Sequence, residues 1–120
     1  MGTRSTITFY ENEQPLVCIY QQYDGYITGV GHELANFLKG KTILNGFNKQ
    51  TMDEGFANGM GCLAAQFIRQ GKTKIGAFYI TSIGESEDYN YHVKLVGDVL
   101  HISVDDFDGT PEQLLQYEEV

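Results

Sequence analysis

Apolar and polar side chains alternate with a period of two over residues 6–10, TITFY. β-Branched and aromatic residues in this alternation are typical of a strand with one buried face. Residues 11–14 (ENEQ) supply turn chemistry, and Pro15 suits the first position of a strand, where no ladder donor is needed. The pattern predicts an N-terminal β-hairpin that returns over residues 16–20.

Helical spacing replaces this alternation further along the chain. Residues 32–40 (HELANFLKG) carry apolar side chains on one helical face and end in a glycine, a natural helix stop. A second helix is predicted over residues 58–71, with an apolar stripe and a start that Asn58 can cap. The apolar positions are Leu34, Phe37 and Leu38 in the first helix and Leu63, Phe67 and Ile68 in the second.

The C-terminal half returns to strand patterns and closes with a helix. Residues 74–82 predict a strand, and residues 88–104 predict a hairpin with Gly97 and Asp98 at its tip. A third helix is predicted over residues 108–119 (DGTPEQLLQYEE). Its start consists of Thr110 as the N-cap, Pro111 as the first helical position and Gln113 as the partner in a capping box.

The segment between the first two helices, residues 43–59, has no clean period. We expect a long connection with one helical turn near residues 51–55, a kind of segment that often binds a ligand or closes over one. The predicted order is therefore ββ, α, α, βββ, α. It indicates the α+β class, with an antiparallel sheet of two N-terminal and three C-terminal strands and a layer of two to three helices on one face. At 120 residues the chain fits a single domain, residues 1–120.

The net charge of −8 narrows the range of partners. The only two arginines are Arg4 and Arg69, and a surface that neutralises many phosphates needs clustered basic residues. We therefore expect no duplex nucleic acid and no anionic membrane as a partner. A small ligand with one or two phosphates remains open, because a few backbone N–H groups and one basic side chain can hold it.

The two cysteines, Cys18 and Cys62, lie in apolar segments. We expect both to be small buried hydrophobes rather than a disulfide pair. The N-terminal residues contain no apolar signal sequence, and no apolar run approaches the length of a membrane span. These features predict a cytoplasmic protein in a reducing compartment.

The first candidate site is QQYDGYITGVGHEL, residues 21–34. Two tyrosine faces could stack a planar base, worth about 1–3 kcal/mol per base, while the aspartate accepts hydrogen bonds from its edge or from a ribose. The alternative is a turn, since Asp-Gly is a turn dipeptide and a tyrosine in the core can direct its hydroxyl to water. The sequence leaves both open. The expected ligand-binding residues here are Gln22, Tyr23, Asp24, Tyr26 and His32.

The second candidate is the start of the second predicted helix, ANGMGCLAAQ. Asn58, Gly59 and Gly61 could hold an anion through exposed backbone N–H groups. A helix end attracts a charge by only about 0.3–1 kcal/mol, so Arg4 or a lysine would have to contribute. The spacing is not that of a P-loop. The pattern favours the alternative, in which the small residues allow close helix packing.

The predicted sheet offers the third candidate. Phe78 could contact a stacked ring, and Asn90 could read the edge of a base. Asn90 lies on the opposite face from Tyr89 and Tyr91, so it would need a partner from elsewhere, such as a second subunit. We expect no metal and no cofactor, because the histidines and cysteines lack the short repeated spacing of ligand sets. Cys62 is expected to be structural rather than a nucleophile.

The segments MGTRS, YQQYDGYITGVGHELANFL, NGMGCLAAQF, GAFYI and EDYNYHV, in this order, resemble a family of small proteins from bacteriophages and bacteria. That family carries a Tyr-Arg-Gln-x-Asp-Gly-Tyr run, a Gly-x-Gly before a helix and an Asn-Gly-Met-Gly-Cys-Leu-Ala-Ala-Gln run. This chain departs from the pattern at Gln21, where the family often has arginine, and so lacks one phosphate contact.

The small size and paired hairpins are also similar to phage anti-defence proteins that sequester cyclic nucleotide-type immune signals, the Thoeris anti-defence type. That resemblance implies a ligand such as a cyclic nucleotide or a cyclic ADP-ribose isomer, bound intact between subunits of a homo-oligomer. It would make the chain a phage protein that acts in the cytoplasm of the host cell.

Three functions are consistent with these patterns. The first, which we expect, is non-enzymatic capture of a nucleotide-derived ligand by Tyr23, Asp24 and Tyr26, with Arg4 or the helix start meeting its phosphates. The second is an inhibitor whose acidic surface mimics nucleic acid or docks on a basic host protein. The third is a small hydrolase that acts through Asp24 and His32.

Overall fold

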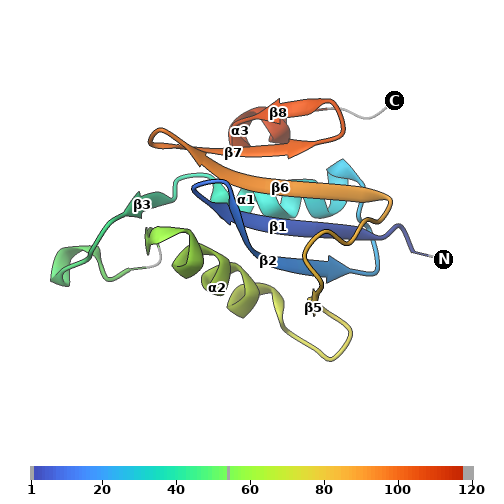
Figure 1. The fold of residues 1–120 in the computed structure, drawn as a ribbon, viewed down its shortest axis with the longest axis horizontal. Helices are drawn as coiled ribbons and strands as arrows, with labels where there is room; N and C mark the ends of the chain where they lie inside the picture. The colour runs from blue at the N-terminus through green and yellow to red at the C-terminus, as the bar shows by residue number, and fades with distance from the viewer. Residues whose placement is uncertain (1, 54, 118–120) are drawn as a thin grey trace.

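A computed structural model describes residues 2–53 and 55–117 (Figure 1). Its strands are β1 (Ser5–Glu11), β2 (Gln14–Gln21), β3 (Thr42–Leu44), β4 (Phe56–Asn58), β5 (Tyr79–Thr81), β6 (Tyr89–Val96), β7 (Val99–Val104) and β8 (Phe107–Gly109). Its helices are α1 (His32–Leu38), α2 (Gly59–Gly71) and α3 (Pro111–Leu115), with a π-helical turn η1 (Ile27–Gly31) and a 3-10 turn η2 (Lys49–Thr51).

Six strands form one sheet in the order β5-β2-β1-β6-β7-β8. This sheet and its helices confirm the predicted α+β class. The prediction of a purely antiparallel sheet is wrong at the centre, because β1 and β6 run parallel, with Ser5 opposite Tyr89 and Phe9 opposite Val93. Side-chain alternation marks a strand without fixing the direction of its neighbour, and the crossover from edge strand β5 brings β6 in beside β1.

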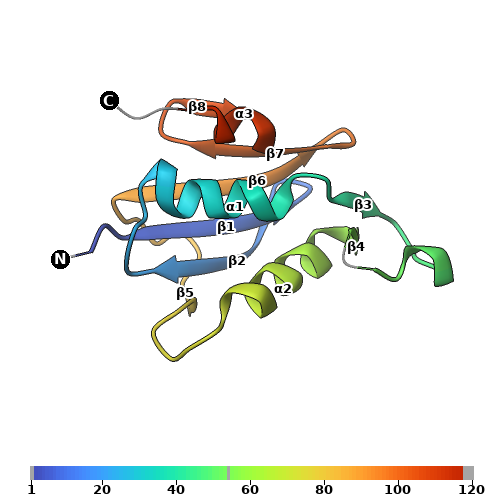
Figure 2. The ribbon, with the colours of Figure 1, turned by 180° about the vertical axis from the view of Figure 1, so that it is seen from behind.

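The helices cover one face of this sheet. Figure 2 shows α1 in front of the central strands β1 and β6 and α3 beside β7 and β8, and α2 joins the same layer through Phe67. The Phe67 ring lies 5.7 Å from the Phe9 ring of β1, 5.1 Å from the Phe37 ring of α1 and 4.9 Å from the Phe78 ring. The buried residues of the sheet and helices form one core, which includes Ile7, Phe9, Ile19, Tyr91, Val93, Ile102, Leu34, Leu63 and Leu114.

The predicted strand over residues 74–82 is largely a loop. Only Tyr79–Thr81 pairs, as β5, with β2. Phe78 has a left-handed backbone, φ 46°, which ends any extended run before β5. Burial of the Phe78 ring against Phe67 accounts for this, since packing in the core outweighs local strand propensity.

The connection over residues 43–59 contains regular structure that the sequence did not reveal. Strands β3 and β4 pair in parallel, with Ile43 opposite Ala57, and form an arm that extends from the body in Figure 1. The helical turn is η2, which shares only Thr51 with the predicted residues 51–55, and residue 54 is outside the described part. The Asn48 side chain starts η2 by accepting a hydrogen bond from the Gln50 N–H at 2.9 Å.

The helix ends follow the sequence in part. Thr110 caps α3, and the capping box with Gln113 is formed, as predicted; residues 118 and 119 of the predicted helix are outside the described part. The cap predicted at Asn58 is wrong, because its side-chain oxygen accepts from the Gly46 N–H at 2.7 Å and so holds the arm instead. Cys18 is buried as expected, whereas Cys62 is only half-buried.

Candidate functional site

Residues 21–34 form an ordered corner between β2 and α1. The Val30 N–H donates to the Asp24 carbonyl oxygen at 2.8 Å, and the Gly25 N–H donates to the Thr3 carbonyl oxygen at 2.9 Å. Asp24 adopts a left-handed backbone, φ 59°, which aspartate tolerates better than most residues. The π-helical turn η1 then leads directly into α1. The stretch is therefore a well-defined turn.

Two glycines of this corner are needed for close packing. A Cβ on Gly25 would lie 2.8 Å from Ser5 Cβ and 2.9 Å from the Arg4 carbonyl group. A Cβ on Gly31 would lie 3.0 Å from the Tyr91 hydroxyl oxygen. The same hydroxyl donates to the Gly25 carbonyl oxygen at 2.7 Å in the buried interior. These glycines let the corner sit directly on β1 and β6.

The two tyrosines of the corner lie at the surface. Tyr23 is 61% exposed and Tyr26 is 37% exposed. The Tyr26 hydroxyl donates to Asp24 Oδ1 at 3.2 Å, so the aspartate already has a partner within the corner. A Cβ on Gly2 would overlap the Tyr23 ring, which places this ring against the N-terminal segment. The corner offers aromatic surface, but neither tyrosine lines the hollows described below.

His32 opens α1, as predicted, but turns inward. Its Nε2 is buried and lacks a hydrogen-bond partner among the residues that the structure describes. Asp24, by contrast, is exposed. The hypothesis of a hydrolase that uses the two together stays a prediction.

Asn90 and Arg4 meet at the turn that precedes β6. Asn90 Oδ1 accepts from the Thr6 hydroxyl at 2.7 Å and from the Glu87 N–H at 2.9 Å, while Nδ2 donates to the Glu87 carbonyl oxygen at 2.9 Å. The backbone N–H of Arg4 donates a hydrogen bond to Asp88 Oδ2 at 3.2 Å. The Asn90 side-chain amide, which the sequence suggested for reading a base, therefore forms hydrogen bonds within this turn and to β1.

The start of α2 and Phe78 also serve packing. Gly59 has φ 87°, and a Cβ there would lie 3.4 Å from Glu11 Oε2. A carboxylate of β1 therefore stands beside this helix start, where the helix dipole favours a negative charge. Gly61 is exposed on the first turn of α2, and Phe78 is buried in the core.

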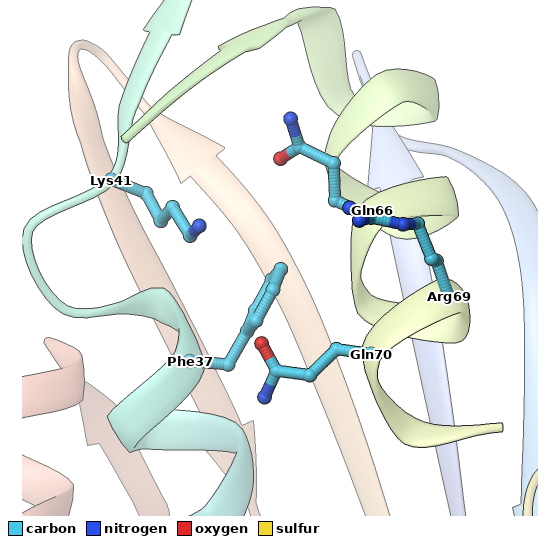
Figure 3. A pocket seen from close by; sticks show the side chains of 5 residues that line it. All are labelled: Phe37, Lys41, Gln66, Arg69 and Gln70. Carbon is cyan, nitrogen blue, oxygen red and sulfur yellow. The ribbon is translucent and has the colours of Figure 1, made fainter. Parts of the chain in front are cut away.

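The structure places a cleft elsewhere, between α1 and α2. Two adjoining hollows of about 190 and 500 Å³ share Phe37, Lys41 and Gln70 as lining residues. Figure 3 shows Phe37 between Lys41 on one wall and the glutamines of α2 on the other. The Lys41 ammonium lies 4.5 Å from the centre of the Phe37 ring, a cation–π contact. We call these two hollows the α1–α2 cleft.

Positive charge gathers in this cleft although the chain is strongly acidic. Lys39, Lys41 and Arg69 line it, and they are three of the eight basic residues of the chain. Glu33 stands at one end. Partial burial raises the pKa of Glu33, and the charge of Asp24 raises this pKa further. Asp24, in the predicted corner, therefore acts electrostatically on one end of the cleft.

Gln66 adds an unusual polar group to the cleft. Its Nε2 donates to the Phe56 carbonyl oxygen at 3.0 Å, which fixes the orientation of the amide. Its Oε1 is buried and lacks a hydrogen-bond partner among the described residues. A buried acceptor without a donor is costly, by about 1–3 kcal/mol, and a ligand with an N–H or O–H group would relieve this cost.

The sequence indicates only some of the residues that line the cleft. Gln66, Arg69 and Gln70 recur at the i, i+3, i+4 spacing of one helix edge, which identifies a polar stripe beside the apolar one. Lys41 follows the predicted stop of α1. Only the packing of α1 against α2 brings these residues together, over more than twenty positions of sequence.

Comparison of the chain with family models, curated proteins and solved structures finds no match. The family resemblance drawn from the sequence therefore stays a prediction. In residues 2–53 and 55–117, no helix is both long enough and apolar enough to cross a membrane. The same residues contain no group of three or more His, Cys, Asp or Glu placed to hold a metal ion.

Proposed function

We propose that the protein is a non-enzymatic binding protein that captures a small anionic, nucleotide-derived ligand in the α1–α2 cleft. The observation that carries this proposal is the clustering of Lys39, Lys41 and Arg69 in one cleft of a chain with a net charge of −8. Such clustering attracts a small anion from solution while the acidic remainder repels larger polyanions.

The neutral side chains of the cleft suit the base and the sugar of a nucleotide. Gln66 and Gln70 line the cleft with side-chain amides, a group that hydrogen-bonds an exocyclic amine or a sugar hydroxyl. The Phe37 ring forms apolar floor beneath the Lys41 ammonium. The larger of the two hollows, about 500 Å³, has the volume of a small-molecule site.

The lining side chains favour binding over reaction. Cations, amides and one aromatic ring hold and orient a ligand, and the carboxyl group of Glu33 stands at one end. We therefore propose that the ligand leaves the protein unchanged. Cyclic nucleotides and cyclic ADP-ribose derivatives are the first ligands to test, because the sequence resemblance suggests them.

A thermal-shift screen with pyrophosphate, ADP-ribose and cyclic nucleotides tests this proposal. A ligand at 100 times its dissociation constant adds about 2.7 kcal/mol, which corresponds to a rise in Tm of roughly 10 °C for a chain of this size. The rise should be lost in Lys41→Gln and Arg69→Gln and kept in Lys49→Gln, which removes a positive charge from η2 instead.

Mass spectrometry of the ligand after heat denaturation of the complex separates binding from hydrolysis. Recovery of the intact ligand agrees with the proposal, and recovery of its products contradicts it. A shift that survives both cleft substitutions would place the ligand elsewhere and would refute the cleft as the site.

A further inference from the structure

The edge strand β5 carries an exposed apolar surface that is not part of the α1–α2 cleft. β5 is an outer strand of the six-stranded sheet and, within residues 2–53 and 55–117, pairs only with β2. Ile80 on this strand is 64% exposed, and Ile75 in the loop before it is 91% exposed. Tyr79 and Ile83 add further exposed apolar surface. A sheet edge with exposed large apolar residues invites pairing with another strand.

The other sheet edge, β8, is protected against such pairing. Asp108 lies within β8, and Asp105 and Asp106 precede it. Like charges along an edge repel a second copy. β5 has the sequence Tyr-Ile-Thr and carries no charge or proline to prevent pairing.

The charges that flank β5 are complementary under a two-fold axis. Lys72 and Lys74 precede the strand, and Glu85, Glu87 and Asp88 follow it. Antiparallel pairing of two β5 strands places the basic loop before the strand in each copy on the same side as the acidic loop after the strand in the other. The Lys72 ammonium also donates to the carbonyl oxygens of Ile75 and Ala77, which holds the basic flank in a defined loop.

We propose that a second copy of this chain pairs with β5 edge to edge, as a symmetric dimer. The two strands run antiparallel with Ile80 near the two-fold axis, so the two six-stranded sheets become continuous. Exposed isoleucines of both copies cover one another, and the opposite flanking charges fix the register. This dimer is independent of the ligand proposal, because its contacts lie on β5 and its flanks.

Light scattering coupled to size exclusion tests the dimer over a range of protein concentrations. The chain should elute with twice its mass of 13.5 kDa. Ile80→Lys should give a single-chain mass, because it places two like charges at the axis. Val96→Lys, at the exposed tip between β6 and β7, is the matched control and should stay dimeric.

Charge reversal tests the register and does not depend on how Ile80→Lys folds. Lys74→Glu and Glu85→Lys should each raise the dimer dissociation constant by about tenfold, and the double variant should recover the original value. A wild-type chain that is monomeric at every concentration would overturn the proposal. So would a dimer that is unaffected by Ile80→Lys or by either charge reversal.

Discussion

The carboxyl group of Glu33 stands at one end of the α1–α2 cleft, close enough to Asp24 for their charges to interact. Partial burial is the larger cause of its raised pKa, and Asp24 is the second. As the pH falls, Glu33 is protonated before an ordinary glutamate of pKa 4.5 would be. The other charged residues that line the cleft within the described part of the chain are Lys39, Lys41 and Arg69, all positive.

We predict that Glu33→Gln strengthens the binding of pyrophosphate at neutral pH by up to about fivefold, the range of an exposed charge interaction. Folding favours the protonated form of Glu33, so its ionised form costs stability above the raised pKa, and the variant should also melt higher at pH 7. Both differences should shrink as the pH falls through the raised pKa of Glu33, because the wild-type side chain then becomes protonated as well. Calorimetric titration and thermal melts across this pH range measure them.

Glu85→Gln serves as the control, because it removes a carboxylate from the loop after β5, which does not line the α1–α2 cleft. It should leave pyrophosphate binding unchanged. If Glu33→Gln weakened binding, or changed it equally at every pH, the assignment of Glu33 to the edge of an anion site would be wrong.

At the scale of elements, α2 links the core to the cleft. Its Phe67 packs among the rings of Phe9, Phe37 and Phe78, while the adjoining edge of the helix presents Gln66 and Gln70 to the cleft. The packing of Phe67 in the core therefore sets the position of α2, and with it the position of the α2 wall of the cleft. Substitutions at the ends of α2 test this docking.

We predict that Gly71→Ala destabilises the fold by about 1–3 kcal/mol, because the added Cβ overlaps the buried Phe78 ring. Gly61→Ala in the same helix is the matched control. A Cβ there meets only Leu16 Cδ1, at 4.0 Å, so this change should stabilise the helix by about 0.5–1 kcal/mol. Urea unfolding of the two variants measures the difference, and equal effects would show that Phe78 does not lock the end of α2.

The elements that the sequence predicted well are those with a strong local signal. The N-terminal hairpin, the turn at Gly97 and the capping box at Thr110 all depend on residues close together in the chain. The parallel pairing of β1 with β6 and the β3–β4 arm depend on contacts between distant segments, which periodicity cannot report.

The proposed α1–α2 cleft was harder to predict than the fold for the same reason. Tyr23, Asp24 and Tyr26 drew attention because aromatic and acidic residues beside glycines resemble a binding loop. In the structure the glycines serve packing on β1 and β6, and the tyrosines face solvent. Lys41 and Gln66 carry no motif, and only the meeting of α1 with α2 makes them neighbours.

At the scale of the whole molecule, charge is segregated. The cleft concentrates three basic residues, while the β8 edge and the turn before β6 carry acidic clusters. This distribution favours a small anion over nucleic acid, because a polyanion must also pass the acidic surface. The same fold leaves β5 uncharged between flanks of opposite sign, which suits self-association at a surface separate from the ligand cleft.

Backbone amide NMR with a titrated anion tests the central claim most directly. With pyrophosphate or ADP-ribose, the largest chemical-shift changes should fall on residues 37–41 and 66–70, the two walls of the cleft. Residues 22–26, in the tyrosine corner, should change little. Changes centred on residues 22–26, or no saturable change at any residue, would contradict the α1–α2 cleft as the binding site.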